Sequence, residues 1–386
     1  MISEYVMAGG KKLRMGITTG TCAALAAQGA VRMLLTGKIL EEACLVTPKG
    51  IRVLEPLLYS SIRSDAASCA VRKDAGDDRD ATDGILIYAR AEIPHVDGEE
   101  DGDIIIEGGE GIGRVTLPGL DQPVGAAAIN SVPRRMIREA ALDAAAALGH
   151  EGPIKITIYA PEGSEIAKKT FNPRLGIEGG ISILGTSGIV EPMSLSALMS
   201  SIAVEIRQKA AMGCTGLILT PGNYGLSYLK EWTAQNGISA LHVPVVVCSN
   251  FIGDAIDCAR EEGIEDILLV GHIGKLVKIA GGIMNTHSRT ADCRMEIITA
   301  HAACCGAEPS ICRELMKAAT TDACITILQR AGLYEAVMAE IMTSVGEHLE
   351  HRSEGRCYVG AVLFSNVCGF IGATEEARQI IDRWKS

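Results

Sequence analysis

The sequence contains few aromatic residues: two Trp, eight Tyr and four Phe in 386 residues, or 4%. Proteins that bind single-stranded nucleic acid stack bases on aromatic side chains, so this scarcity argues against that class. Positive charge is not in excess either. The formal net charge is −11, which argues against non-specific binding to phosphate backbones. Apolar residues still make up 47% of the chain and charged residues 22%, as is typical of globular proteins.

Signals for a membrane or an oxidising compartment are missing. No run approaches eighteen apolar residues, and residues 1–12 lack the apolar segment of a secretory signal. The thirteen cysteines include no Cys-x-x-Cys pair, so a reducing cytoplasm fits better than a disulfide framework. The closest cluster, His301 with Cys304, Cys305 and Cys312, lacks the spacing of a structural zinc site. We therefore predict buried thiols and no metal site.

Familiar nucleotide-binding and catalytic motifs are also absent. No register of residues 108–113 gives G-x-G-x-x-G. Around Gly271, a Walker A loop would need Gly where Leu269 stands and Ser or Thr where Leu276 stands. The acidic run 74–80 does not fit an EF-hand, and no Gly-x-Ser-x-Gly elbow occurs. A kinase or other nucleotide-binding enzyme, argued from glycine loops alone, is thus a disfavoured alternative.

Residues 1–175 are predicted to form a mixed-sheet α+β domain. The hydroxyls of residues 18–21 can cap a helix over 21–35, and Pro133 lies in the first turn of a helix over 133–148. Short β-like runs separated by Gly, Pro and Asp clusters lie at 43–46, 52–58, 67–71, 85–92, 104–107, 113–117 and 154–160.

Residues 176–386 are predicted to form a Rossmann-like, doubly wound and mostly parallel α/β domain. Almost uninterrupted apolar runs indicate strands buried on both faces. Helical segments alternate with them, which indicates βαβ units. The predicted strands lie at 181–184, 216–219, 243–247, 267–270 and 358–364, and the helices near 194–211, 224–236, 252–262 and 375–384, with a helical insertion near 275–350.

Polar, glycine-containing loops lie at the ends of several predicted elements. Residues 16–22 open the first helix, where backbone N–H groups can hold a carboxylate, although plain N-capping also explains them. Residues 185–188 and 271–275 follow predicted strands, and ligands bind at the carboxyl ends of strands in open α/β sheets.

The acidic excess of the chain lies in one segment. Between Asp74 and Glu110 there are thirteen Asp or Glu and two Arg, a net charge of −11. The plain interpretation is a solvated acidic face.

Several long and unusual runs extend nearly from end to end of the chain: residues 16–24, 73–78, 129–137, 165–177, 179–190, 271–275 and 285–288. In these runs the sequence resembles the CbiD family, the cobalt-precorrin-5B C-1 methyltransferases of anaerobic cobalamin (vitamin B12) biosynthesis. The resemblance implies methyl transfer from S-adenosylmethionine to carbon C-1 of cobalt-precorrin-5B, giving cobalt-precorrin-6A. It implies a small-molecule substrate and no nucleic-acid or membrane partner. Cobalt enters only as part of the substrate.

The implied acceptor is a macrocycle that carries many carboxylates, so cations should bind it. The substrate-binding candidates are Thr18, Thr19, Gly20, Thr21, Arg134, Arg135, Lys168, Lys169, Arg174, Gly274, Lys275 and Lys278. Each cation can equally be an ordinary surface base. Methyl transfer needs mainly alignment of the reactants, which supplies up to about 7–11 kcal/mol. If a proton must leave the macrocycle, His272 or His287 is the candidate base, unless these histidines are capping or core residues.

The donor is expected in the crevice between the first and third strands of the doubly wound sheet. The cofactor-binding candidates are Gly185, Thr186, Ser187, Gly188, Ser249 and Asn250, with Asp74, Asp77 and Asp78 lining the cleft near the cationic sulfonium. The run 97–103 is expected to be solvated. Neutralising Asp77 and Asp78 should therefore reduce donor binding or turnover more than neutralising Glu99 and Glu100 does. A non-catalytic tetrapyrrole carrier is the remaining alternative, and it would transfer no methyl group.

Overall fold

The computed structural model describes residues 4–8, 10–94, 104–222, 224–225, 227–229 and 243–385. The chain forms two compact units, Met1–Ser194 and Leu195–Ser386, and each is described by itself. No helix within the described ranges is both long and apolar enough to cross a membrane. The run 97–103, predicted to be solvated, lies outside the described residues.

The N-terminal unit is built on a five-stranded mixed sheet, in which one pair of strands is parallel and the others are antiparallel. Its strand order is β6 (Leu58–Ile62), β7 (Ala66–Arg72), β8 (Leu86–Glu92), β11 (Ile154–Tyr159) and β9 (Ile104–Gly108). Strand β11 alternates buried isoleucines with half-buried residues, and this period of two directs Ile154, Ile156 and Ile158 into the core.

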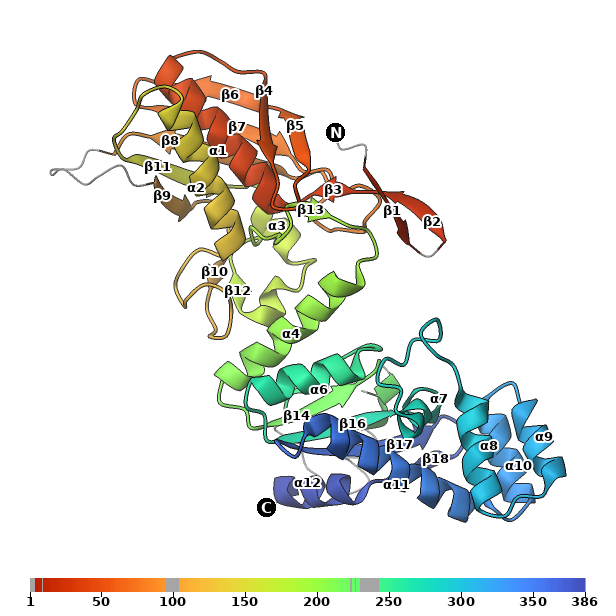
Figure 1. The fold of residues 1–386 in the computed structure, drawn as a ribbon. Coiled ribbons are helices and arrows are strands. Elements are labelled where there is room, and N and C mark those ends of the chain that lie inside the picture. Colours follow the sequence, from red (N-terminus) through yellow and green to blue (C-terminus); the bar gives the residue numbers. More distant parts are fainter. Residues whose placement is uncertain are drawn as a thin grey trace. The chain divides into compact units, whose positions relative to one another are not determined.

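Two helices pack on this sheet, α1 (Thr19–Thr36) and α2 (Ser131–Ala146). They lie side by side along it (Figure 1). Small residues, among them five alanines, allow most of α1 to be buried, and Gly37 ends it in the left-handed conformation. The sequence predicts these helices over 21–35 and 133–148, within about two residues of the observed ends.

Short strand pairs complete the N-terminal unit. Two are local antiparallel pairs, and two join segments that are far apart in the sequence. They are β1 (Tyr5–Ala8) with β2 (Lys11–Arg14), β4 (Glu42–Val46) with β5 (Arg52–Pro56), β3 (Gly16–Ile17) with β13 (Ile189–Val190), and β10 (Arg114–Val115) with β12 (Ile177–Glu178). Short helices α3 (Gly163–Ala167) and η1 (Asn172–Leu175) precede β12.

The C-terminal unit is built on a sheet with four parallel strands and one antiparallel edge strand. Its strand order is β15 (Val245–Val247), β14 (Gly216–Thr220), β16 (Asp266–His272), β17 (Tyr358–Ser365) and β18 (Gly369–Ala373). The sequence predicts the four parallel strands and a mostly parallel sheet, because its apolar runs lack alternation, but it does not predict β18.

Helices cover both faces of this sheet. On one face lie α4 (Leu195–Ala211), α6 (Ile252–Glu261) and α11 (Tyr334–Ser353), and on the other lies α12 (Glu375–Lys385). Leu217 and Leu219 pack with the first group, whereas Ile218 packs with α12. Burial on both faces explains the uninterrupted apolar strands.

A helical segment connects β16 to β17, as the sequence predicts for residues 275–350. Figure 1 shows most of it gathered at one end of the sheet. It consists of α7 (Ile273–Leu276), η2 (Val277–Gly281), α8 (Arg294–Cys304), α9 (Pro309–Met316), α10 (Thr321–Arg330) and α11.

The apolar run 181–184 is not a strand of the C-terminal sheet, so that prediction is wrong. Ile181 and Ile183 form single bridges with Ile112 and Ile129 in the N-terminal unit. Together with β12 and β13, these bridges join residues 177–190 to the N-terminal unit, and the observed division falls at Ser194/Leu195 where the sequence predicts 175/176. The first strand of the C-terminal sheet is therefore β14, and its strand order reverses between β14 and β16.

Candidate functional site

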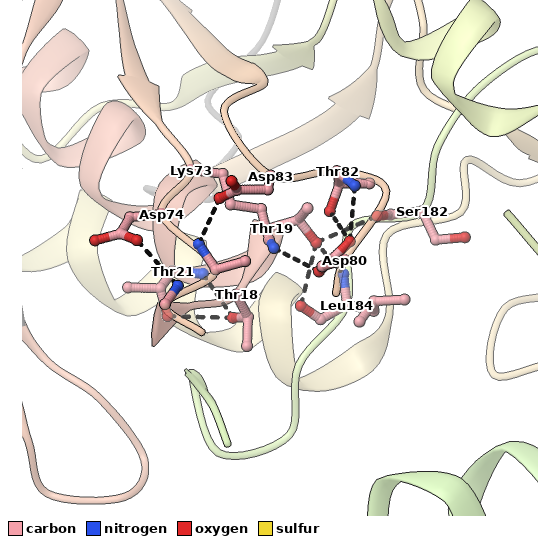
Figure 2. Close-up of polar contacts among 12 residues, drawn as sticks. Thr18, Thr19, Thr21, Lys73, Asp74, Asp80, Thr82, Asp83, Ser182 and Leu184 are labelled. Carbon is pink, nitrogen blue, oxygen red and sulfur yellow. Dashed lines mark hydrogen bonds and ion pairs between the residues drawn. The ribbon is translucent and has the colours of Figure 1, made fainter. Parts of the chain in front are cut away.

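The N-terminus of α1 joins three of the sequence runs singled out above. The Ile17 N–H donates to the Asp74 carbonyl at 2.8 Å, and the Thr18 N–H donates to the Gly188 carbonyl at 3.2 Å. The Gly20 N–H donates to the Leu184 carbonyl at 3.1 Å. The helix N-terminus, the acidic loop and the glycine loop at 185–188 are thus one assembly (Figure 2).

Three buried threonines, Thr18, Thr19 and Thr21, hold this assembly together, and we call them the threonine hub. The Thr21 hydroxyl donates to the Gly188 carbonyl at 2.6 Å. The Thr19 hydroxyl accepts from the Leu184 N–H at 2.9 Å, and that of Thr18 accepts from the Thr21 N–H at 3.2 Å. The amides of residues 20 and 21, predicted to be open to a carboxylate, therefore have acceptors within the protein. A substrate-binding role for the hub residues stays a prediction.

Replacing Thr21 by valine is expected to lower the free energy of unfolding by about 1–3 kcal/mol. The change keeps the shape but removes the donor to the buried Gly188 carbonyl. Urea unfolding measures it. Thr343→Val is the control, because its hydroxyl also donates to a carbonyl but is exposed on α11. Equal, small losses in both variants would contradict a structural role for Thr21.

The acidic loop that follows β7 is stabilised by internal ion pairs and hydrogen bonds. The Arg14 guanidinium donates both Nη groups to the Asp74 carboxylate, and this interaction lowers the pKa of Asp74. Asp77 accepts from the Arg14 N–H at 2.6 Å, and Asp78 is half-buried. Asp74 and Asp77 therefore already have protein partners, and their predicted contact with the donor stays a prediction.

The same loop contains a buried cation. The Lys73 ammonium, on a side chain only 2% exposed, contacts the Asp80 carboxylate at 2.5 Å. Burial alone would raise the pKa of Asp80, but Lys73 and the hydrogen bonds from Lys73 and Thr82 outweigh burial and lower it. Asp83 accepts from the Ala75 N–H at 2.8 Å. This ion pair was not predicted from the sequence, although Lys73 lies in a run that resembles the family.

The cations predicted from the first half of the chain differ in exposure. Arg134 is half-buried, donates to the Ile129 carbonyl at 2.8 Å, and has its pKa lowered by burial. The other four are exposed, and two of them have acidic partners, Arg135 with Glu139 and Lys168 with Glu165. The exposed four are Arg135, Lys168, Lys169 and Arg174.

A second set of predicted residues lies at the carboxyl edge of the C-terminal sheet. Ser249 and Asn250 follow β15, His272 is the last residue of β16, and Gly274 and Lys275 follow it. The run 285–288 reaches the same edge, because the Thr286 N–H donates to the Asn250 carbonyl at 3.0 Å. Residues 185–188 belong to the N-terminal unit and residues 249–250 to the C-terminal one, so the prediction that both loops belong to one sheet is wrong.

Two lysines of this edge are bound to backbone carbonyls. The Lys275 ammonium is half-buried and donates to the Pro221 carbonyl at 2.8 Å. Burial lowers the pKa of Lys275. Lys278 is buried and donates to the carbonyls of Thr286 and Ala291, with Asp292 at 3.6 Å. Lys275 thus lies at the strand-order reversal, the usual ligand position in such sheets.

Both predicted catalytic histidines accept hydrogen bonds through Nδ1. His272 accepts from the Gly274 N–H at 3.0 Å, and His287 accepts from the Arg289 N–H at 3.1 Å. Neutral imidazole then carries its proton on Nε2. Each histidine therefore presents an Nε2–H group that can donate to an anionic oxygen. Removal of a proton would need a ring nitrogen with a free lone pair, and Nδ1 already accepts a hydrogen bond.

Stability is expected to fall below about pH 6.5 because of His272. Burial lowers the pKa of His272 from its ordinary value of 6.5, against the opposing effect of Asp322. Between the two pKa values the unfolded chain binds more protons, so the stabilisation is complete above pH 6.5 and is lost as the pH falls. Urea unfolding at several pH values should show a weaker dependence in His272→Gln. The exposed His351→Gln is the control, and the same dependence in all three proteins would contradict this assignment.

The cysteines do not form a metal centre in the part of the chain that the structure describes. No group of three His, Cys, Asp or Glu side chains is placed there to bind an ion. The predicted burial of the thiols holds for five of the thirteen and is wrong for the cluster near His301, where Cys304 is exposed and Cys305 and Cys312 are half-buried. Cys69 and Cys248 are buried, and burial raises the pKa of each thiol to about 12. Both are therefore protonated and unreactive at neutral pH.

Comparison with known proteins matches this chain to two family models, CbiD over residues 6–192 and CbiD, C-terminal domain, over residues 285–375. A chain from Ruminiclostridium cellulolyticum is 46% identical over 369 residues, covering 95% of this chain and 92% of that one. A chain from Alkaliphilus metalliredigens is 38% identical over 385 residues, covering 100% of this chain and 98% of that one. Both relatives are named cobalt-precorrin-5B C(1)-methyltransferase.

A crystal structure described as cobalamin biosynthesis protein (cbiD) from Archaeoglobus fulgidus is also similar. It is 28% identical, covers 75% of this chain and 87% of its own, and has a TM-score of 0.39.

The fold described above is that of a mixed α/β protein with a doubly wound C-terminal unit. The matches to these two relatives cover 95% and 100% of the chain. The chain belongs to the CbiD family.

Proposed function

We propose that this protein transfers a methyl group from S-adenosylmethionine to carbon C-1 of cobalt-precorrin-5B, giving cobalt-precorrin-6A in the cytoplasm. The observation that carries the proposal is the 46% identity, over 95% of the chain, to a relative named for this methyl transfer. The cobalt belongs to the substrate, so the proposal requires no metal ligands from the chain.

The carboxyl edge of the C-terminal sheet fits a substrate with carboxylate groups. Lys275 supplies a half-buried ammonium whose contact within the protein is a carbonyl. The Nε2–H of His272 and of His287 adds neutral donors. A hydrogen bond in which the donor or the acceptor is charged is roughly twice as strong as a hydrogen bond between two neutral groups. These residues bind and orient the macrocycle, and a base is not needed for attack on the methyl group.

The donor supplies a methyl group on a sulfonium, which leaves as a neutral thioether. We propose the loop Gly185–Gly188 of the N-terminal unit as its contact. Gly185 has φ of +127°, and a Cβ atom there would clash with the side chain of Thr18. Only glycine can therefore occupy this position. Thr186 is exposed on the same loop, and its side chain is therefore accessible to a ligand.

Anaerobic incubation with methyl-labelled S-adenosylmethionine and cobalt-precorrin-5B tests the function. The expected product is heavier by one methyl group, and carbon NMR locates the label at C-1. Corrinoid binding without label transfer would instead favour the carrier alternative. Thermal protection by ATP, with none from S-adenosylmethionine, would favour a nucleotide-binding enzyme.

A further inference from the structure

The C-terminal unit contains a cavity of about 760 Å³ that the sequence did not reveal. It lies beside the end of β17, where Ser365 and Asn366 form part of its wall, and α12 supplies another part. Ligand cavities in proteins are commonly about 300–1,000 Å³, so this one has the size of a binding site.

Aromatic rings are concentrated in this cavity. The whole chain has fourteen Phe, Tyr and Trp residues, yet Tyr224, Tyr228, Phe364 and Phe370 all line this one space. Tyr228 and Phe364 stack with their ring centroids 4.1 Å apart and their planes 5° apart. Phe370 and Tyr224 are 48% and 72% exposed. Phe364 is only 1% exposed and Tyr228 is half-buried, so the exposed rings of Tyr224 and Phe370 are the ones that offer apolar surface to a planar ligand.

The charged residues of the cavity favour an anion. Arg378 and Lys385 of α12 line it together with a single acid, Asp382. Each cation has an exposed acidic neighbour three residues away on the same helix, Glu375 at 3.6 Å and Asp382 at 3.3 Å. Such exposed pairs are worth only about 0.3–0.5 kcal/mol, so a ligand carboxylate can replace them. Burial raises the pKa of Tyr228 to about 12, so its phenol adds no negative charge.

The cavity adjoins the carboxyl edge described above. Phe364 meets the ring of His272 edge to face, with the centroids 5.6 Å apart. Ser365 donates to Asp322, the carboxylate that opposes the pKa shift of His272. The His272 loop and the cavity therefore share a wall, and one ligand can contact both.

We propose that this cavity binds the macrocycle, with one ring face of the tetrapyrrole against the aromatic residues and carboxylates at its edge on Arg378 and Lys385. This assignment rests on the proposed function, since it concerns the substrate of that reaction. S-adenosylmethionine fits less well, because its sulfonium and ammonium outweigh its one carboxylate, whereas the cavity lining is itself net positive.

Two kinds of variant test this assignment, and both alter partly exposed side chains. Arg378→Gln/Lys385→Gln removes the charges, and Phe370→Ala removes one ring. Anaerobic absorbance titration with cobalt-precorrin-5B and calorimetry with S-adenosylmethionine give the two Kd values separately. We expect the charge variant to weaken macrocycle binding by at least tenfold and Phe370→Ala by several-fold, with donor binding changed by less than twofold. Arg330→Gln/Arg356→Gln, two exposed and acid-paired cations of the same unit, should leave both unchanged.

If the variants lose affinity for S-adenosylmethionine and keep their affinity for the macrocycle, the cavity is the donor site and the assignment is overturned. Macrocycle affinity equal to that of the control in both variants would overturn it as well. The proposed function is judged separately, from turnover by the unmodified protein. If that protein binds both ligands and forms no product, the methyltransferase proposal fails, while the effect of the variants on macrocycle binding still decides the assignment.

Discussion

Replacing Gly16 by alanine is expected to prevent stable folding of the N-terminal unit. A Cβ atom at residue 16 would lie 2.3 Å from the carbonyl carbon of Ala75 and 2.4 Å from the Asp74 carbonyl oxygen. These are backbone atoms, which cannot rotate away. Gly76 meets the opposite segment in the same way, since its Cβ would lie 2.3 Å from the Arg14 carbonyl oxygen. The two segments cross where neither residue has a side chain.

The expected cost is at least about 3 kcal/mol, at the upper end for inserting atoms into a packed core. Urea unfolding of the full chain, followed by circular dichroism, measures it. Gly152→Ala is the matched control, because its nearest neighbour is the movable His150 ring at 3.4 Å. If Gly16→Ala lowers the free energy of unfolding by less than about 1 kcal/mol, the two segments can move apart at little cost and the prediction is wrong.

Replacing Lys275 by methionine is expected to weaken corrinoid binding by about 10–100-fold and to spare donor binding. The methionine keeps most of the stem and loses the half-buried ammonium at the strand-order reversal. A hydrogen bond to a charged group contributes about 1.5–3 kcal/mol, which corresponds to this range. The same two titrations, with the macrocycle and with S-adenosylmethionine, provide the measurement.

Lys317→Met is the control for this prediction, because Lys317 is an exposed lysine of the same unit just after α9. It should change neither affinity. If Lys275→Met loses donor affinity and keeps corrinoid affinity, the two ligands have been assigned to the wrong loops.

Much of the fold could be predicted from local patterns. The alanine-rich run after Thr18 predicts α1, and the uninterrupted apolar runs predict β14 and β16 as buried parallel strands. The run 181–184 has the same apolar character and was assigned to the wrong sheet. An apolar pattern predicts burial, but the choice of partner depends on hydrogen bonds to residues 111–130, which no local pattern encodes.

The site could be predicted only in part, for a related reason. Thr18, Asp74 and Gly188 are each predicted ligand contacts, but each has a partner within the protein. The Thr18 N–H donates to the Gly188 carbonyl, and the Asp74 carbonyl accepts from the Ile17 N–H. Composition and spacing cannot distinguish a polar loop that binds a ligand from one that supports a helix. Likewise, the sequence offers His272 as a base, whereas the choice of ring nitrogen depends on the Gly274 N–H. The aromatic cavity was missed because its rings are dispersed between residues 224 and 370.

The threonine hub has a consequence for synthesis on the ribosome. Thr21 and its acceptor Gly188 are 167 residues apart, so α1 leaves the exit tunnel long before the segment that completes its N-terminus. At about 5–20 residues per second, this interval lasts roughly ten to thirty seconds. During that time a helix that is mostly buried in the finished unit has no complete binding surface. The nascent chain therefore presents this buried helix before the segment that completes its N-terminus, and chaperones that bind emerging apolar segments have access to it during that interval.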